Sequence, residues 1–174
     1  HSPKQIIMRL LTLWGYIILT QSLFAQIFTE VSVPFEGISE GSIAFADVDG
    51  DLDQDVLITG LNNSLTPISK LNLNDGMGNF SEVMGSPFED VTKGSIAFAD
   101  MDGDLDQDIL ITGVNNSFTS ITNLYLNDGM GNFSEVITTP FEDVRFSSVA
   151  FADIDDDKDQ DVLITGSITS KLYT

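Results

Sequence analysis

The sequence predicts an all-β protein assembled from repeated units of four short antiparallel strands. The first supporting observation is an internal repeat: Gly41–Gly60 (GSIAFADVDGDLDQDVLITG) returns as Gly94–Gly113 and, with changes, as Ser147–Gly166. Each copy starts 53 residues after the one before. The second observation is that apolar residues alternate or form short blocks between turn-forming residues, with no helical period. A long repeat made of strands indicates stacked sheets rather than a helical array.

The first repeat contains four predicted strands. The first, around Ile43, alternates large and small residues and ends at an aspartate-rich stretch, and the second, Val56–Thr59, is nearly all apolar. Leu71–Leu73 is the third and Phe80–Val83 the fourth, joined by Asn74–Gly78, whose glycines favour a hairpin turn. An all-apolar second strand is expected in a sheet covered on both faces.

Four-stranded units that stack face to face are typical of the blades of a β-propeller. The alternative is a β-sandwich with two similar halves, and the threefold recurrence favours the propeller. Propellers close with about four to eight blades, so we expect an incomplete propeller, a fragment of a longer repeat protein. The expected segments are an N-terminal extension and signal peptide (1–25), the end of a degenerate blade (26–40), two full repeats (41–93 and 94–146) and a truncated third (147–174).

Each repeat carries an aspartate motif in which every second residue is aspartate. The first motif runs from Asp47 to Asp55, the second from Asp100 to Asp108 and the third from Asp153 to Asp161. A solvated acidic surface is the simpler alternative, but it explains neither the alternation nor the recurrence. Oxygen ligands at alternate positions of a short loop suit Ca²⁺, which accepts six to eight oxygens in irregular geometry. The candidate metal ligands are Asp47, Asp49, Asp51, Asp53, Asp55, Asp100, Asp102, Asp104, Asp106, Asp108, Asp153, Asp155, Asp157, Asp159 and Asp161.

Within a motif we expect the side chains at positions one, three, five and nine to bind the ion. Position seven offers its backbone carbonyl or its carboxylate, and Gly50 at position four of the first motif lets the loop fold back. An EF-hand is excluded, because it needs glycine at position six and glutamate at position twelve, where Leu52 and Ile58 stand. Mg²⁺ is the weaker candidate, since it prefers strict octahedral sites and keeps its waters.

Composition restricts the function classes. A net charge of −20 argues against nucleic acid and anionic membrane surfaces as partners. The chain has no cysteine, and its one histidine, His1, precedes the expected signal peptide. Catalysis by a histidine-containing triad and zinc binding by histidine are therefore not expected of the mature chain.

The N-terminal residues have the pattern of an export signal. Lys4 and Arg9 precede the short apolar stretch Leu10–Leu19, and cleavage after Ala25 would expose Gln26. An uncleaved membrane anchor is the alternative, but the stretch is shorter than the roughly 20 apolar residues that a span needs. We therefore expect a secreted or cell-surface protein that has no membrane contact after signal cleavage.

The motifs resemble the FG-GAP/VCBS repeat family, the calcium-binding blades also found in integrin α-chain propellers. The family loop reads D-x-D-G-D-G-x-x-D between two apolar strands, and Phe45–Gly60 and Phe98–Gly113 match it closely. The two LNDGMGNF segments are similar to a turn of the bacterial members. The resemblance implies a Ca²⁺-stabilised β-propeller in a secreted or surface protein, and it implies no single activity.

The motifs also depart from the family pattern. Leu52 and Leu105 replace the second loop glycine, and Asp156 and Lys158 replace both glycines of the third motif. A side chain in a left-handed position is unfavourable, and Lys158 adds a cation beside the site. We expect up to three Ca²⁺ sites, of which the third is the weakest.

Three functions are compatible with the sequence. The first is a non-catalytic module for adhesion or for binding an extracellular protein or polysaccharide. Asn62–Ser64 and Asn115–Ser117 are its candidate contacts, with plain polar turns as the alternative. The second is an accessory region of a larger secreted enzyme, such as a polysaccharide-degrading one, and the third is a rigid scaffold. We expect no catalysis, because the clustered aspartates are better explained as metal ligands.

Overall fold

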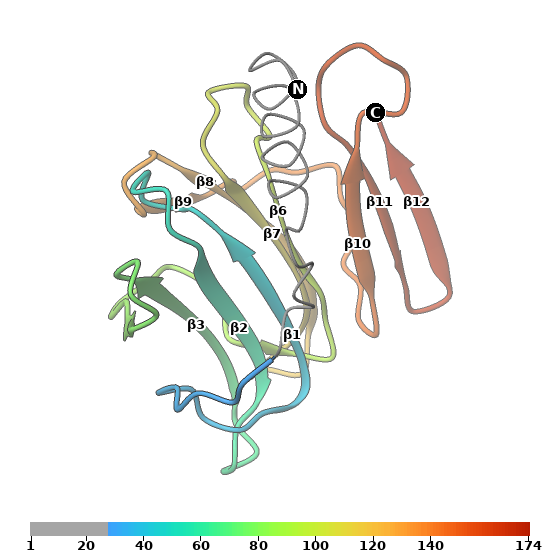
Figure 1. Cartoon of the computed structure of the whole chain (residues 1–174). Helices are drawn as coiled ribbons and strands as arrows, with labels where there is room; N and C mark the ends of the chain where they lie inside the picture. Colours follow the sequence, from blue (N-terminus) through green and yellow to red (C-terminus); the bar gives the residue numbers. More distant parts are fainter. Residues whose placement is uncertain (1–27) are drawn as a thin grey trace, which may run out of the picture. The chain divides into compact units, whose positions relative to one another are not determined.

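A computed structural model describes residues 28–174, which form strands, turns and loops only. Within this range, twelve strands make three antiparallel sheets that follow one another along the sequence (Figure 1). The predicted all-β class with propeller-like sheets is confirmed. The expected signal peptide lies outside the described residues. In the part of the chain that the structure describes, no helix is long and apolar enough to cross a membrane.

The first sheet contains the four strands predicted for the first repeat. In order across the sheet these are β1 (Ser39–Ala46), β2 (Asp55–Leu61), β3 (Pro67–Asn74) and β4 (Phe80–Glu82). β2 and β3 are longer than the sequence indicates, because they pair along their whole length up to a short hairpin loop. The polar residues at the start of β3 therefore lie in a strand that its own composition does not favour.

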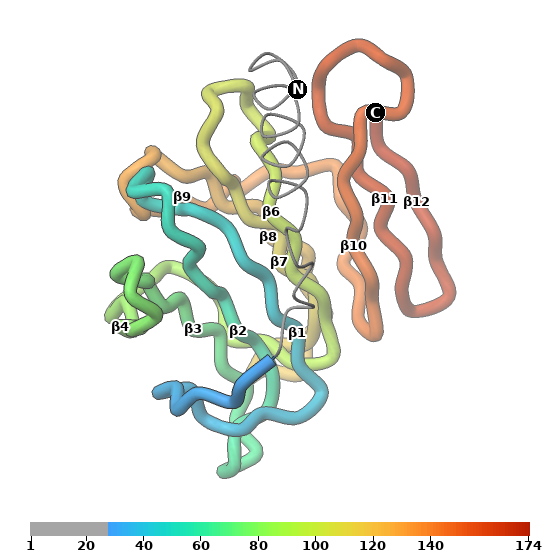
Figure 2. The backbone as a smooth tube through the Cα atoms, in the orientation of Figure 1, coloured from blue at the N-terminus to red at the C-terminus, as the bar shows by residue number. Residues whose placement is uncertain are grey.

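The second sheet repeats this arrangement with one interruption. Its strands are β5 (Val91–Thr92), β6 (Ile96–Ala99), β7 (Asp108–Asn115), β8 (Ser120–Asn127) and β9 (Phe133–Glu135). β5 and β6 both pair with β7 and together take the place that β1 has in the first sheet. The tube in Figure 2 shows the chain passing from the first sheet into this one.

The third sheet has three described strands. β10 (Ser148–Ala152) pairs with β11 (Asp161–Gly166), which pairs with β12 (Thr169–Tyr173). The hairpin between β11 and β12 is tight, since Gly166 pairs directly with Thr169. The corresponding hairpins of the first two sheets have longer loops, of five residues (62–66) and four residues (116–119), consistent with the shorter sequence of the third repeat.

The central strand β7 joins two hydrophobic cores. Ile109 and Ile111 belong to a core shared with Leu57 of the first sheet, and the intervening Leu110 belongs to a core shared with Val162 of the third sheet. Alternate residues of a strand point to opposite faces, so β7 is covered on both sides. This is the burial expected from its unbroken apolar sequence.

A short segment between the first two sheets holds them together. Phe88 packs edge-on against Tyr125 of β8, with ring centres 5.1 Å apart, and the Glu89 N–H donates to the Tyr125 hydroxyl at 3.0 Å. The Ser69 N–H of β3 donates to the Asp90 carboxylate at 2.8 Å. The segment is therefore bonded to its own sheet on one side and to the next sheet on the other. The same contacts recur between the second and third sheets, through Phe141, Glu142, Asp143, Thr122 and Tyr173.

Candidate metal sites

Each aspartate motif connects an outer strand to the central strand of its sheet. The sequence predicts the whole motif as a hairpin loop, whereas the structure begins the central strand at the ninth position. Asp55 pairs with Ala46 and Asp108 with Ala99, so the pairing of β1–β2 and β6–β7 extends to the last aspartate. Because the ninth aspartate lies at the start of the central strand, it is buried: Asp55 and Asp108 are 0% exposed, and Asp161 is 1% exposed.

The same three positions of every motif come together. Positions one, three and nine each offer one carboxylate oxygen, and in each group these oxygens lie within 4.8 Å of one another. Such a group could hold a metal ion, because it gathers hard, charged oxygens around one point. The three groups are Asp47, Asp49 and Asp55; Asp100, Asp102 and Asp108; and Asp153, Asp155 and Asp161.

Positions five and seven do not join these groups. In the first motif the Asp51 carboxylate accepts the Asp53 N–H at 2.9 Å. The Asp53 carboxylate lies against Gly76 in the turn after β3, where a Cβ on that glycine would collide with it. The second motif places Asp106 against Gly129 in the same way. The sequence alone does not predict this contact, and metal binding by positions five and seven stays a prediction.

The first aspartate of each motif organises its loop. The Gly50 N–H donates to one oxygen of Asp47 at 2.8 Å, and the Leu52 N–H donates to the other at 2.9 Å. The second and third motifs form the equivalent bonds. Two backbone N–H groups of the loop thus hold the position-one carboxylate in place, so hydrogen bonds within the loop fix this member of the group.

Positions four and six of every motif adopt the left-handed backbone conformation. Gly50 has φ of 79°, but Leu52 and Leu105 hold φ of 74° and 79° without being glycine. In the third motif both residues are non-glycine, with φ of 69° at Asp156 and 80° at Lys158. The conformation costs an L-residue about 1–2 kcal/mol. The third loop therefore carries more strain than the others, and the weaker binding expected at its site stays a prediction.

The ninth aspartate ties the motif to the turn that follows the next strand. Asp55 accepts the Val48 N–H at 3.0 Å through one oxygen and the Asn74 N–H at 2.8 Å through the other. Asp108 repeats both bonds in the second sheet. In the third sheet Asp161 accepts the Ile154 N–H at 2.6 Å, and its second oxygen has no partner among the described residues.

Burial disfavours the ionised form of the Asp55 and Asp108 carboxylates. It is the main cause of a raised pKa at Asp55 and at Asp108, where the backbone donors oppose the rise and nearby aspartates add to it. Burial, followed by the charge of Asp51, also raises the pKa of Asp49. A divalent cation would oppose these shifts, because its attraction favours the ionised carboxylates and offsets the repulsion between them.

The first motif also contacts the second repeat. The side-chain amide of Asn127, at the end of β8, donates to the Val48 carbonyl at 2.8 Å. In the same region, a Cβ placed on Gly50 would lie 3.3 Å from the Gly129 carbonyl. The turn of one repeat is thus packed on the aspartate motif of the repeat before it. The sequence predicts the recurring Asn-Asp-Gly turn, but it does not predict that the turn packs on the aspartate motif of the preceding repeat.

Antiparallel sheets that stack through shared cores, each with an acidic group at one hairpin, define a propeller-like repeat protein with candidate cation sites. Residues 100–164 match the family model described as FG-GAP-like repeat. The match runs from the second aspartate motif through most of β11 and includes the third motif. The resemblance to FG-GAP repeats is thereby confirmed for this part of the chain. No curated protein matches the chain.

Proposed function

We propose that the chain is a calcium-binding repeat module of a secreted or cell-surface protein that binds an extracellular protein or polysaccharide without catalysing a reaction. The observation that carries the calcium proposal is the gathering of positions one, three and nine in all three motifs, within 4.8 Å in each case. An acidic surface patch would explain neither this recurrence nor the buried aspartate in each group.

The role proposed for calcium is structural. Unit charges 4 Å apart repel by about 4 kcal/mol at an effective dielectric of 20, and three carboxylates in a group form three such pairs. This repulsion is comparable with the whole stability of a domain, about 5–15 kcal/mol. Calcium would reverse its sign and pin the outer strand to the central strand. Extracellular calcium levels suit such sites, since extracellular modules bind it with a Kd of about 10⁻⁴–10⁻³ M.

The absence of catalysis is part of the same proposal. The grouped aspartates are held by backbone N–H groups, and position nine is fully buried in each motif, which suits a ligand better than a proton donor. The sequence of the described residues offers neither cysteine nor histidine. FG-GAP repeats are typically extracellular, which supports the proposed location.

Calcium is expected to raise the melting temperature of the chain. At 10 mM Ca²⁺ and a Kd of about 1 mM, each site adds about 1.4 kcal/mol. Three sites add about 4 kcal/mol, which corresponds to a shift of about 10 °C or more for a chain of this size. The measurement is a thermal melt followed by circular dichroism in EDTA, in Ca²⁺ and in Mg²⁺. An equal melting temperature in EDTA and Ca²⁺ for a folded chain would contradict the proposal.

A further inference from the structure

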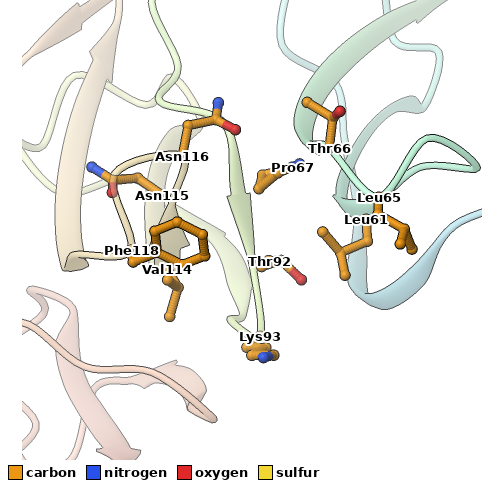
Figure 3. Close-up of a pocket in the computed structure, with 10 residues that line it drawn as sticks. All are labelled: Leu61, Leu65, Thr66, Pro67, Thr92, Lys93, Val114, Asn115, Asn116 and Phe118. Atoms are coloured by element: carbon orange, nitrogen blue, oxygen red, sulfur yellow. The ribbon is translucent and has the colours of Figure 1, made fainter.

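A cleft lies between the first and second repeats, at the hairpins that join β2 to β3 and β7 to β8. Its volume is about 290 Å³. Figure 3 shows Leu61 and Leu65 on one side, Asn116 and Phe118 on the other, and Lys93 between them. No aspartate of the three motifs lines it. We call it the inter-repeat cleft, lined by Leu61, Leu65, Thr66, Pro67, Thr92, Lys93, Val114, Asn115, Asn116 and Phe118.

The cleft exposes two large apolar side chains at its hairpin loops. Phe118 is 88% exposed and Leu65 is 76% exposed, although both are large apolar residues. Both also hold left-handed backbone conformations, with φ of 61° and 57°, and so does Lys93 with φ of 57°. At Leu65 and Phe118 this conformation closes the hairpin loop, since their N–H groups donate to the Asn62 and Asn115 carbonyls at 2.9 Å. A large exposed apolar side chain thus recurs at the same position of two repeats.

Hydrogen-bonding groups stand beside the apolar surface. The Asn115 side chain already has hydrogen-bond partners within the protein. Its oxygen accepts hydrogen bonds from the Ser117 and Thr119 N–H groups, and its amide donates to the Glu89 carboxylate. The equivalent Asn62 also caps its own loop, so the first asparagine of each Asn-Asn-Ser segment is a turn residue. The amide of Asn116 makes no side-chain hydrogen bond within residues 28–174, which leaves its donors and its acceptor for a ligand.

The charge in the cleft is balanced. The Lys93 ammonium lies 3.6 Å from the Glu40 carboxylate and 5.6 Å from the centre of the Phe146 ring. A polyanion would find no unpaired cation there and would meet a chain of net charge −20. An uncharged ligand therefore fits better than an acidic one.

We propose that the inter-repeat cleft binds one sugar unit of a neutral polysaccharide, an inference that rests on the proposed ligand-binding function and specifies its ligand. The C–H face of the sugar ring packs on Phe118 and Leu65, and the Asn116 amide and the Thr66 hydroxyl bond its hydroxyl groups. The volume is near the lower end of the range for small-molecule sites, about 300–1,000 Å³, which suits a single ring. A folded protein partner would instead need a standard interface of about 800 Å² on each side.

The test is calorimetric titration of the full chain in 5 mM Ca²⁺ with hexasaccharides of glucose, xylose and mannose. Hexagalacturonate and a pool of apolar octapeptides are the comparison probes. We expect at least one neutral hexasaccharide to bind, and the uronate and the peptides not to bind. Phe118→Ala should weaken that binding at least tenfold and Asn116→Ala should weaken it measurably. The matched control is Ile137→Ala, which removes an apolar side chain of the same repeat that is 86% exposed and does not line the cleft.

Three results would overturn the inference: no neutral hexasaccharide binds, binding is unchanged in Phe118→Ala, or only the uronate or the peptides bind. Melting curves of each variant in Ca²⁺ and EDTA accompany the titrations. A calcium-dependent melt without sugar binding would reject the cleft and leave the calcium module intact. Sugar binding without a calcium-dependent melt would reject the calcium module and leave the sugar-binding cleft intact.

Discussion

Asp108→Ala is expected to destabilise the protein by about 4 kcal/mol in Ca²⁺. The fully buried Asp108 carboxylate accepts the Met101 N–H at 2.7 Å and the Asn127 N–H at 2.9 Å. A hydrogen bond to a charged group contributes about 1.5–3 kcal/mol, and the substitution leaves both donors unpaired. It also removes the buried member of the proposed second calcium site. Thermal melts in Ca²⁺ should show a fall of roughly 10 °C.

Two comparisons separate these contributions. Asp104→Ala removes a charge from the same motif, but position five lies outside the group and is exposed, so its loss should be much smaller. In EDTA the Asp108→Ala loss should shrink, because removing a buried carboxylate also relieves the desolvation that raises its pKa. Equal losses for Asp104→Ala and Asp108→Ala would show that position nine has no special role.

The second large effect is expected from Tyr125→Ala, at about 4 kcal/mol. The Tyr125 side chain is fully buried in the core shared by the first two sheets, and it contacts both Phe88 and the Glu89 N–H. Removal of a large buried aromatic costs about 3–5 kcal/mol. Urea unfolding in a fixed Ca²⁺ concentration measures the loss.

The conservative variant Tyr125→Phe keeps the ring and loses only the hydroxyl that accepts from Glu89. It should cost about 1–2 kcal/mol, since one backbone donor is left without its partner. Similar small losses for both variants would mean that stacking of the repeats does not depend on this contact.

Much of the fold could be predicted because the repeat pattern is local. The alternation around Ile43 and the apolar run Val56–Thr59 correspond to β1 and β2, and the glycine-rich turn after Asn74 lies where expected. The start of β3 at Pro67 could not be predicted in this way. Its polar residues are strand only because they pair with β2, and this pairing is a property of the sheet.

The candidate sites likewise combine features that the local sequence predicts with features that depend on tertiary packing. The spacing of the aspartates predicts that carboxylates gather, and positions one, three and nine do so. That Asp53 is directed at Gly76, and that Asn127 reaches the Val48 carbonyl, depend on how turns from other strands pack on the motif. The second contact joins residues 79 apart in the sequence, beyond the reach of a local pattern.

The central claim is that the three groups bind calcium, and a calorimetric titration of the chain with Ca²⁺ tests it most directly. The account predicts up to three ions per chain, with a Kd of about 10⁻⁴–10⁻³ M and weakest binding at the third motif. Asp49→Ala and Asp102→Ala should each remove one ion, because each variant breaks one group. A folded chain that takes up no Ca²⁺ in this range, or that binds the same number of ions in both variants, would contradict it.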